Sequence, residues 1–161
     1  MKPNIRVGYG YDVHALAEGV DFWLGGIQIP HTHGAYGHSD ADVLIHVICD
    51  ALLGAANMRD IGYHFSDTDP KFKGIDSKIL LKDVIKIIGE KGYKVGNVDA
   101  TVCLQRPKIG PHIEQMKTTL AQVMDVDVED VSVKATTTEK LGFVGKEEGV
   151  AAHAVVLIYK E

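Results

Sequence analysis

The chain has 161 residues, with 17 lysine and arginine residues against 22 aspartate and glutamate residues, and a formal net charge of −5. This length fits one domain, residues 1–161, that can bury a core of its own, and the composition is ordinary for a globular protein. The acidic balance argues against nucleic acid as a partner, because a nucleic-acid site requires a basic patch, but not against a small anionic ligand.

The first part of the chain predicts a strand, a hairpin and a helix. A strand broken by glycines is predicted over residues 5–14, and a hairpin over residues 22–29. A helix is predicted over residues 39–56, with Ser39 as its N-cap in a capping-box pattern with Asp42.

The next segment, residues 57–76, has no clear periodicity. A loop of this length in a compact domain is usually functional or mobile. Its residues Asp60, Asp67 and Asp69 suit contact with a substrate or an ion. The alternative is a solvated Ω-loop, and the sequence leaves both open.

The rest of the chain predicts two helices and three strands. One helix is opened by Ser77 and stopped by Gly92, and another covers residues 111–124. Because strands and helices mix without a regular repeat, we expect an α+β fold with helices packed on one face of a sheet. The remaining strands are predicted over residues 93–105, 131–135 and 150–159.

The two cysteines, Cys49 and Cys103, lie in apolar segments and form no CxxC pair. Such a placement is typical of reduced core thiols rather than of a disulfide framework or a zinc knuckle. No signal peptide, transit peptide or membrane span is recognisable, so we expect a cytoplasmic protein without a membrane partner.

Polar side chains recur on the predicted helix of residues 39–56, although its other residues are mostly aliphatic. Asp42, His46 and Asp50 stand four residues apart and so share one face. Buried polar groups cost free energy unless a partner satisfies them. We expect Asp42 to cap the helix and Asp50 to orient the imidazole of His46.

A metal site is predicted from Asp12, His14 and His46. Asp12 and His14 stand two apart on the first strand, so their side chains point to one face. With His46 they form a suitable ligand set for Zn²⁺, whose fourth position stays open. The alternative, that His46 is a hydrogen-bonded core residue, stays open. His31 and His33 form a competing pair that we expect to be solvated.

Other segments have the composition of phosphate contacts. Residues 37–39 precede a helix, where free N–H groups and the dipole favour phosphate, although Ser39 could serve only as a cap. Residues 135–143 place three hydroxyls and Glu139 at a strand end, which suits phosphate and a second hard cation, or alternatively a T-x-x-E cap. Lys108 could neutralise a phosphate or be a surface lysine.

Taken together, these patterns identify a family. The chain carries, in order, GYGYDVH, GHSDADVLIHVICDALLGAA, DIGYHFSDTDP, IDS, QRPKIGPHIEQM and VKATTTEKLGFVGKEEG. It closely resembles the 2-C-methyl-D-erythritol 2,4-cyclodiphosphate synthase family over about residues 6–157. The combination of DVH, HSDADVLIH and TTTEKLGF is highly specific to that family.

The resemblance implies an α+β subunit with helices on one face of a four-stranded mixed sheet. It implies a homotrimer whose sheets surround the threefold axis and whose active sites lie between subunits. The implied activity is that of a metal-dependent lyase in non-mevalonate isoprenoid synthesis. It converts 4-diphosphocytidyl-2-C-methyl-D-erythritol 2-phosphate into the cyclic diphosphate and CMP. No protein nucleophile is needed, because the 2-phosphate of the substrate attacks its own β-phosphorus.

The matched motifs also imply roles for single residues. Asp12, His14 and His46 would hold zinc, and Glu139 magnesium or manganese. His38 and Thr137 match positions that stabilise the transition state. The matched substrate-binding positions are Asp12, Val13, His14, His38, Ser39, Asp60, Ile61, Gly62, Phe65, Ser66, Asp67, Thr68, Asp69, Ser77, Leu104, Gln105, Arg106, Pro107, Lys108, Ile109, Gly110, Thr136, Thr137, Thr138, Glu139, Phe143 and Lys146.

Few positions depart from the family pattern. Ser66 stands where the family usually has proline, and Lys146 stands where arginine is common, which loses a bidentate fork. His31 and His33 have no counterpart in the pattern.

Two other functions share the metal ligands. One is a zinc-dependent phosphohydrolase that acts on a nucleotide diphosphate substrate through a metal-bound hydroxide. The other is a non-catalytic trimeric ligand-binding protein, which predicts that metal-site residues have been lost. Asp12, His14, His46 and Glu139 are all present, which favours an enzyme.

Overall fold

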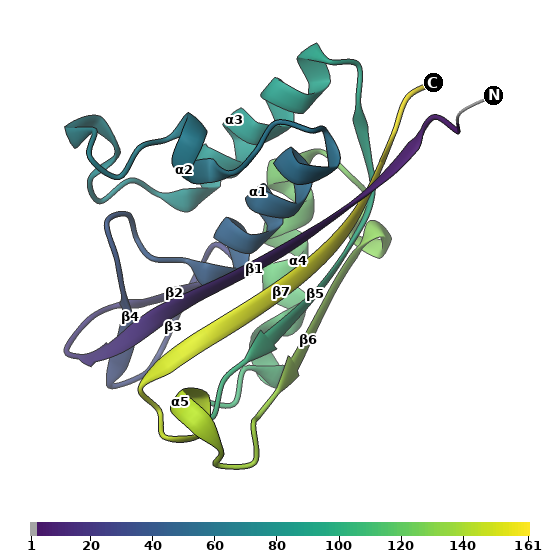
Figure 1. Ribbon diagram of the computed structural model, residues 1–161. Coiled ribbons are helices and arrows are strands. Elements are labelled where there is room, and N and C mark those ends of the chain that lie inside the picture. The colour runs from purple at the N-terminus through teal and green to yellow at the C-terminus, as the bar shows by residue number, and fades with distance from the viewer. Residues whose placement is uncertain (1–2) are drawn as a thin grey trace.

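The computed structural model describes residues 3–161, and these residues form a five-stranded mixed sheet in the order β4-β1-β7-β5-β6 (Figure 1). Neighbouring strands are antiparallel, except that β5 and β6 are parallel. The strands are β1 (Ile5–Glu18), β4 (His33–Tyr36), β5 (Lys94–Cys103), β6 (Val131–Thr136) and β7 (Gly149–Tyr159). The α+β class and the mixed sheet are therefore confirmed.

The expected count of four strands is wrong, because β4 adds a short fifth strand beside β1. β4 has four residues, of which Gly34 and Ala35 are both buried, so it lacks the alternation that identifies a strand. The predicted hairpin is confirmed as a separate two-stranded sheet of β2 (Phe22–Leu24) and β3 (Ile27–Ile29).

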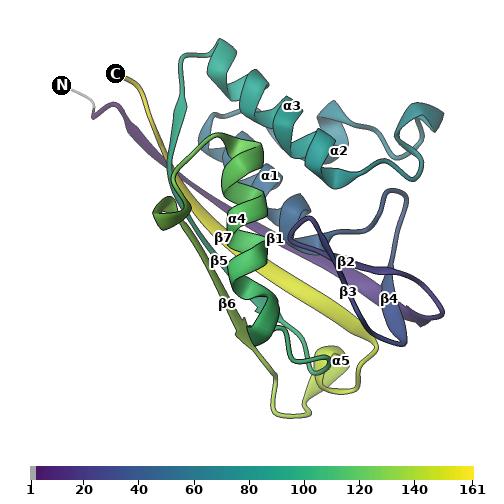
Figure 2. The ribbon, with the colours of Figure 1, turned by 180° about the vertical axis from the view of Figure 1, so that it is seen from behind.

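Three helices cover one face of the five-stranded sheet, as predicted (Figure 2). They are α1 (Val43–Ala55), α3 (Ser77–Glu90) and α4 (Ile113–Met124). None of the helices in residues 3–161 is long and apolar enough to cross a membrane. The short helical segments are α2 (Ile61–His64), α5 (Gly142–Gly145), η1 (Pro70–Phe72), η2 (Gly110–His112) and η3 (Val128–Asp130).

Helix α1 lies at the centre of the fold, between the sheet and α3 (Figure 1). Its side chains are buried except at Asp50 and Gly54. The helix approaches β1 closely because that strand has Gly8 and Gly10 where it crosses α1. A Cβ atom at Gly8 would overlap the Ala51 carbonyl oxygen, and one at Gly10 the Val47 carbonyl oxygen. The glycines thus bring β1 within reach of side chains from α1.

The opposite face of β1 is open and apolar. Even-numbered residues of β1 face the helices, whereas Val7, Tyr9, Tyr11 and Val13 are exposed on the other side, Val7 by 66%. Figure 1 looks onto this face, and no helix of the described residues covers it. A contiguous exposed apolar face of this kind marks an interaction surface.

One of the two predicted helix starts is wrong. Ser39 does not cap α1, because Ala41 has a left-handed φ of 57°, which prevents a helix from beginning before Asp42. Asp42 is the N-cap and accepts a hydrogen bond from the Ile45 N–H at 3.0 Å. The other predicted start is confirmed, because α3 begins at Ser77, with Asp76 as its N-cap.

The alternative of a T-x-x-E cap over residues 136–139 is also wrong, because no helix of the described residues begins there. Glu139 and Lys140 have left-handed φ values of 53° and 63°, which no right-handed helix accommodates. The next helix, α5, begins only at Gly142.

Candidate active site

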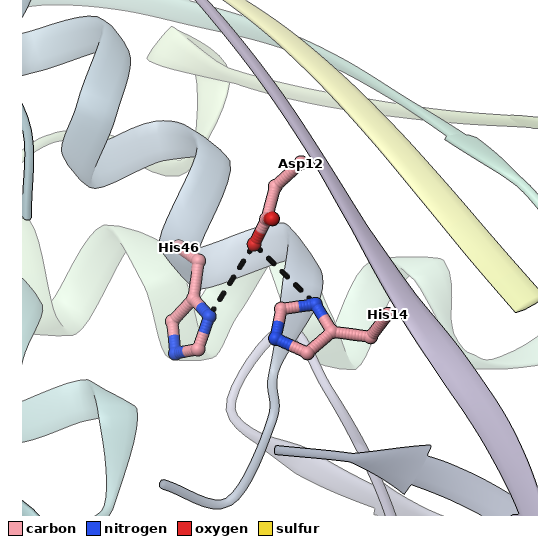
Figure 3. A group of neighbouring side chains, drawn as sticks. All are labelled: Asp12, His14 and His46. Atoms are coloured by element: carbon pink, nitrogen blue, oxygen red, sulfur yellow. Dashed lines mark ion pairs between the residues drawn. The ribbon is translucent and has the colours of Figure 1, made fainter. Parts of the chain in front are cut away.

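Three side chains, Asp12, His14 and His46, converge between β1 and α1 and are called the triad. One ligand atom from each lies within 4.8 Å of the others. Figure 3 shows the Asp12 carboxylate between the two imidazoles, with its Oδ2 atom 3.4 Å from Nδ1 of His14 and 3.4 Å from Nδ1 of His46. The predicted proximity of the three side chains is therefore confirmed.

The environment of the triad fits a cation. Nδ1 of His14 is buried and has no hydrogen-bond partner among residues 3–161. Burial, opposed by the charge of Asp12, lowers the pKa of His14 below its ordinary value of 6.5, so the neutral imidazole is favoured. Two imidazole nitrogens and one carboxylate match a three-ligand zinc site with an open fourth position. A metal ion would satisfy the orphaned nitrogen.

Each polar residue of α1 has a different partner. Asp42 is fully buried, and besides capping the helix it accepts hydrogen bonds from the N–H groups of Gly25 at 2.9 Å and Gly26 at 2.7 Å. Asp50 accepts a hydrogen bond from the Ile61 N–H at 2.8 Å. The prediction that Asp50 orients His46 is therefore wrong, and Asp50 holds the start of α2 instead.

Nε2 of His46 faces away from the triad and lies 2.9 Å from the Ser77 hydroxyl and 3.1 Å from the Ser39 hydroxyl. Both interpretations of His46 thus have a basis in the structure. One ring nitrogen is hydrogen-bonded, and the other remains available at the triad.

A cavity of about 340 Å³ opens above the triad. It combines the triad with residues that precede α1 and with the loop of residues 57–76. We call its predicted members the cavity group. They are Asp12, His14, His38, Ser39, His46, Ile61, Gly62, Phe65 and Asp67.

Sequence reasoning missed the apolar part of this cavity. Phe72, Ile75 and Leu80 also line it. Phe72 packs edge-on against Phe65, with their ring centroids 5.5 Å apart. The signal was present in the sequence, since apolar residues within an otherwise polar loop usually pack against something.

The loop of residues 57–76 is partly ordered by its own aspartates. Asp60 caps α2 through the Tyr63 N–H, and Asp69 caps η1 through the Lys71 N–H. Neither of them lines the cavity, whereas Asp67 does. Ser66 and Thr68 bond to each other at an exposed position, 2.8 Å apart.

Val13 and Ser77 take positions that the sequence did not specify. The Val13 side chain lies on the open face of the sheet, opposite the triad, and its N–H donates to Asp12 Oδ1 at 2.8 Å. Ser77 is fully buried beside His46.

The other predicted residues form a second set, the loop group, which comprises residues 104–110, residues 136–139, Phe143 and Lys146. Backbone contacts hold its segments together: the Leu104 N–H donates to the Thr136 carbonyl at 2.9 Å. Arg106 forms an exposed ion pair with Glu147. Within the described residues, no hydrogen bond or ion pair joins the loop group to the cavity group.

His31 and His33, the competing pair of the sequence analysis, lie near the loop group. The rings of His31 and His33 stand 5.9 Å apart, and the charges of Arg106 and Glu147 both act on His31. Within residues 3–161 the triad is the only group of three or more potential metal ligands, and His31 and His33 belong to no such group.

Comparisons with known proteins agree on one family. The sequence profile of the YgbB family matches residues 5–159. The 2-C-methyl-D-erythritol 2,4-cyclodiphosphate synthase of Parabacteroides distasonis is 67% identical over 157 residues, covering 98% of both chains. The protein of the same name from Porphyromonas gingivalis is 58% identical over 158 residues, again covering 98% of both.

Solved structures have the same fold. The bifunctional IspDF of Campylobacter jejuni superimposes with a TM-score of 0.94 and 43% identity, covering 98% of this chain but only 42% of that longer one. A CDP complex of IspF from Plasmodium falciparum superimposes with a TM-score of 0.86 and 34% identity, covering 100% of this chain and 99% of that one.

Proposed function

The chain belongs to the YgbB family, and from that premise we propose that it is a 2-C-methyl-D-erythritol 2,4-cyclodiphosphate synthase. The substrate is 4-diphosphocytidyl-2-C-methyl-D-erythritol 2-phosphate, and the products are the cyclic diphosphate and CMP. The observation that carries this proposal is the triad at the cavity in a chain 67% identical over nearly its whole length to a protein of that name. The free cysteines Cys49 and Cys103 are compatible with a reducing, cytoplasmic location.

The reaction needs positioning and charge neutralisation rather than a protein nucleophile. An oxygen of the 2-phosphate bonds to the β-phosphorus, and the bond from that phosphorus to the oxygen retained by CMP breaks. Holding the two phosphates in line removes much of the entropic cost of this step. His38 and Ser39, on the cavity wall, are placed to donate hydrogen bonds to phosphate oxygens.

We assign Asp12, His14 and His46 to zinc, and Glu139 to magnesium or manganese. Bound cations would supply Lewis acidity, which offsets the charge that develops on the phosphate oxygens. Asp12, His14 and His46 would hold the first cation at the cavity, where it would act on the phosphates of the substrate. Ile61, Gly62 and Phe65 form the side of the cavity that would enclose the methylerythritol and exclude water.

The loop group would bind the cytidine and its phosphates. A CDP complex of a protein 34% identical to this chain supports a cytidine nucleotide as the ligand. Thr137 would stabilise the transition state, and Lys108 would neutralise a phosphate. Neither residue lines the cavity of its own chain. This separation supports an active site that combines the cavity group of one subunit with the loop group of another.

The open sheet face supports the same assembly. Val7, Tyr9, Tyr11 and Val13 expose apolar surface that a homotrimer with sheets around a threefold axis would cover. One trimeric assembly would thus cover the exposed sheet face and also bring a loop group to each cavity. These two features of the chain support the trimer independently.

Product analysis tests the reaction. The purified protein with Zn²⁺ and Mg²⁺ should release CMP and cyclic diphosphate in equal amounts. A zinc phosphohydrolase with the same ligands would instead add water to the β-phosphorus and release CMP and the open-chain 2-C-methyl-D-erythritol 2,4-bisphosphate. ³¹P NMR of the products separates the two, and an open-chain product would refute the proposed synthase.

Subunit mixing tests the shared site. His46→Ala damages only the cavity group, and Glu139→Gln damages only the loop group, so each homotrimer should be inactive. In every mixed trimer refolded from both variants, one of the three sites would combine an intact His46 from one variant with an intact Glu139 from the other. Each mixed trimer should therefore regain about a third of the wild-type activity. If each site lay within one subunit, no activity would return.

A further inference from the structure

Asp40, Ser77 and His46 are linked by a chain of hydrogen bonds that ends at the triad. The Ser77 hydroxyl donates to Asp40 Oδ1 at 2.5 Å and lies 2.9 Å from Nε2 of His46. Nδ1 of the same imidazole faces Asp12 (Figure 3). Asp40 does not belong to the predicted site, and Ser77 was expected to contact substrate.

The chain of hydrogen bonds determines which ring nitrogen of His46 carries the proton. A serine hydroxyl has one hydrogen, and Ser77 gives it to Asp40, whose carboxylate only accepts. Ser77 can therefore only accept from His46, which requires the proton on Nε2. The lone pair of His46 is then on Nδ1, the atom that faces Asp12 and His14.

The anchor of this chain is itself held by the backbone. Asp40 Oδ2 accepts from the Ser77 N–H at 2.9 Å, and Oδ1 also accepts from the Asp42 N–H at 3.1 Å. The Asp40 N–H donates to the Ile75 carbonyl at 3.2 Å. The carboxylate thereby ties the segment before α1 to the start of α3, on either side of His46.

Ser39 also contacts Nε2 of His46, but its position differs. Its hydroxyl lies on the cavity wall and accepts from the Ala41 N–H at 3.2 Å. Ser77 is 0% exposed and lines no part of the cavity. Ser39 can thus exchange His46 for a ligand, whereas Ser77 cannot.

We propose that Asp40 and Ser77 are positioning residues that hold His46 in the Nε2–H tautomer and aim its Nδ1 lone pair at the metal. The inference rests on the proposed metal site. A carboxylate or other acceptor behind a ligating histidine fixes the ring and raises its basicity, and its loss typically weakens metal binding 10- to 100-fold. Here a buried serine relays that effect from the carboxylate to the imidazole.

The test compares Ser77→Ala and Asp40→Asn with Asp76→Asn in the intact protein. Asp76 caps the same helix through the Lys78 N–H at 2.9 Å but does not contact His46. Zn²⁺ affinity is measured by competition with a chromophoric chelator, and the Co²⁺-substituted protein gives a d–d absorption spectrum. Ser77→Ala and Asp40→Asn should weaken Zn²⁺ binding about 10- to 100-fold and shift the spectrum. Asp76→Asn should change neither.

The double variant tests whether the two residues act in series. If Asp40 acts through Ser77, adding Asp40→Asn to Ser77→Ala should weaken Zn²⁺ binding by less than twofold more. Unchanged affinity in Ser77→Ala, or an equal loss in Asp76→Asn, would overturn the inference. The metal site is tested separately by His46→Ala. If that variant keeps full zinc occupancy, the proposed metal site is refuted, whatever the roles of Asp40 and Ser77.

Discussion

The cavity group and the loop group differ in what holds them. The triad within the cavity group is built on the buried helix α1 and the helix-facing side of β1, and a buried hydrogen bond with Ser77 fixes His46. The loop group lies at and beyond the ends of β5 and β6, and apart from the buried Leu104 and Ile109 its residues are accessible. Backbone contacts and one exposed ion pair hold it. The metal-binding part of the proposed site is therefore preorganised by the buried core, whereas the nucleotide-binding part lies at the surface.

This difference suggests a division of tasks. A rigid, buried set of ligands suits a metal that must stay bound between turnovers. Exposed loops suit a nucleotide that must enter and leave. Substitutions in the triad should therefore lower zinc content, whereas those in the loop group should lower turnover and leave zinc bound.

The largest effect is expected from His46→Ala. The variant should lose zinc and at least about a thousandfold in turnover, since metal ions contribute several kcal/mol of transition-state stabilisation. Metal analysis and a CMP-release assay measure both quantities, and gel filtration checks the assembly. His112→Ala, a histidine that does not line the cavity, is the control and should keep both. Full zinc content in His46→Ala would contradict the assignment.

Glu139→Gln should lose activity about a hundredfold or more and keep its zinc. The amide keeps the shape of the side chain but removes the charge that would hold the second cation. The same two assays apply, with the exposed Glu129→Gln as a control. A loss of zinc equal to that of His46→Ala would place Glu139 at the first metal and remove the distinction between the two groups.

Asp42→Ala should lower the free energy of unfolding by about 3 kcal/mol or more. The substitution leaves the N–H groups of Gly25, Gly26 and Ile45 without their acceptor, and each buried unsatisfied donor costs about 1–3 kcal/mol. Urea denaturation at one protein concentration measures the loss. Asp76→Ala removes only a half-exposed cap and should cost about 1 kcal/mol, so equal losses would contradict this account.

The smallest effect is expected from pH. Burial lowers the pKa of His14 in the folded protein below the 6.5 of the unfolded chain. Between these two pKa values the unfolded chain therefore binds more protons than the folded one. The metal-free protein should therefore lose stability as the pH falls below about 6.5, and His14→Gln should lose less over the same range. Urea denaturation in the presence of a chelator measures the two slopes. Parallel slopes would show that His14 is not the group responsible.

The sequence predicted the long elements and the triad because their signals are local. A spacing of two placed Asp12 and His14 on one side of a strand, and the polar stripe in an aliphatic helix singled out His46. The errors arose where tertiary contacts or backbone conformation decide. Ser39 resembled a cap, but the left-handed Ala41 prevents it.

Partners distant in sequence were beyond such reasoning. Asp50 stands one turn from His46, yet it bonds to Ile61. Asp40 and Ser77 are 37 residues apart in the sequence, and no pattern in either segment predicts their hydrogen bond. β4 is too short to show alternation, and it exists because β1 extends to Glu18 and offers it an edge.

Gly8 and Gly10 have a consequence for how this protein can evolve. Where β1 crosses α1, the two backbones approach without an intervening side chain. The separation between the strand that carries Asp12 and His14 and the helix that carries His46 therefore depends little on the size of any core residue. During evolution, substitutions can change the volumes of core side chains while the ligands keep their spacing. The lack of a Cβ atom at Gly8 and Gly10 thus keeps the spacing of the metal ligands independent of substitutions in the core.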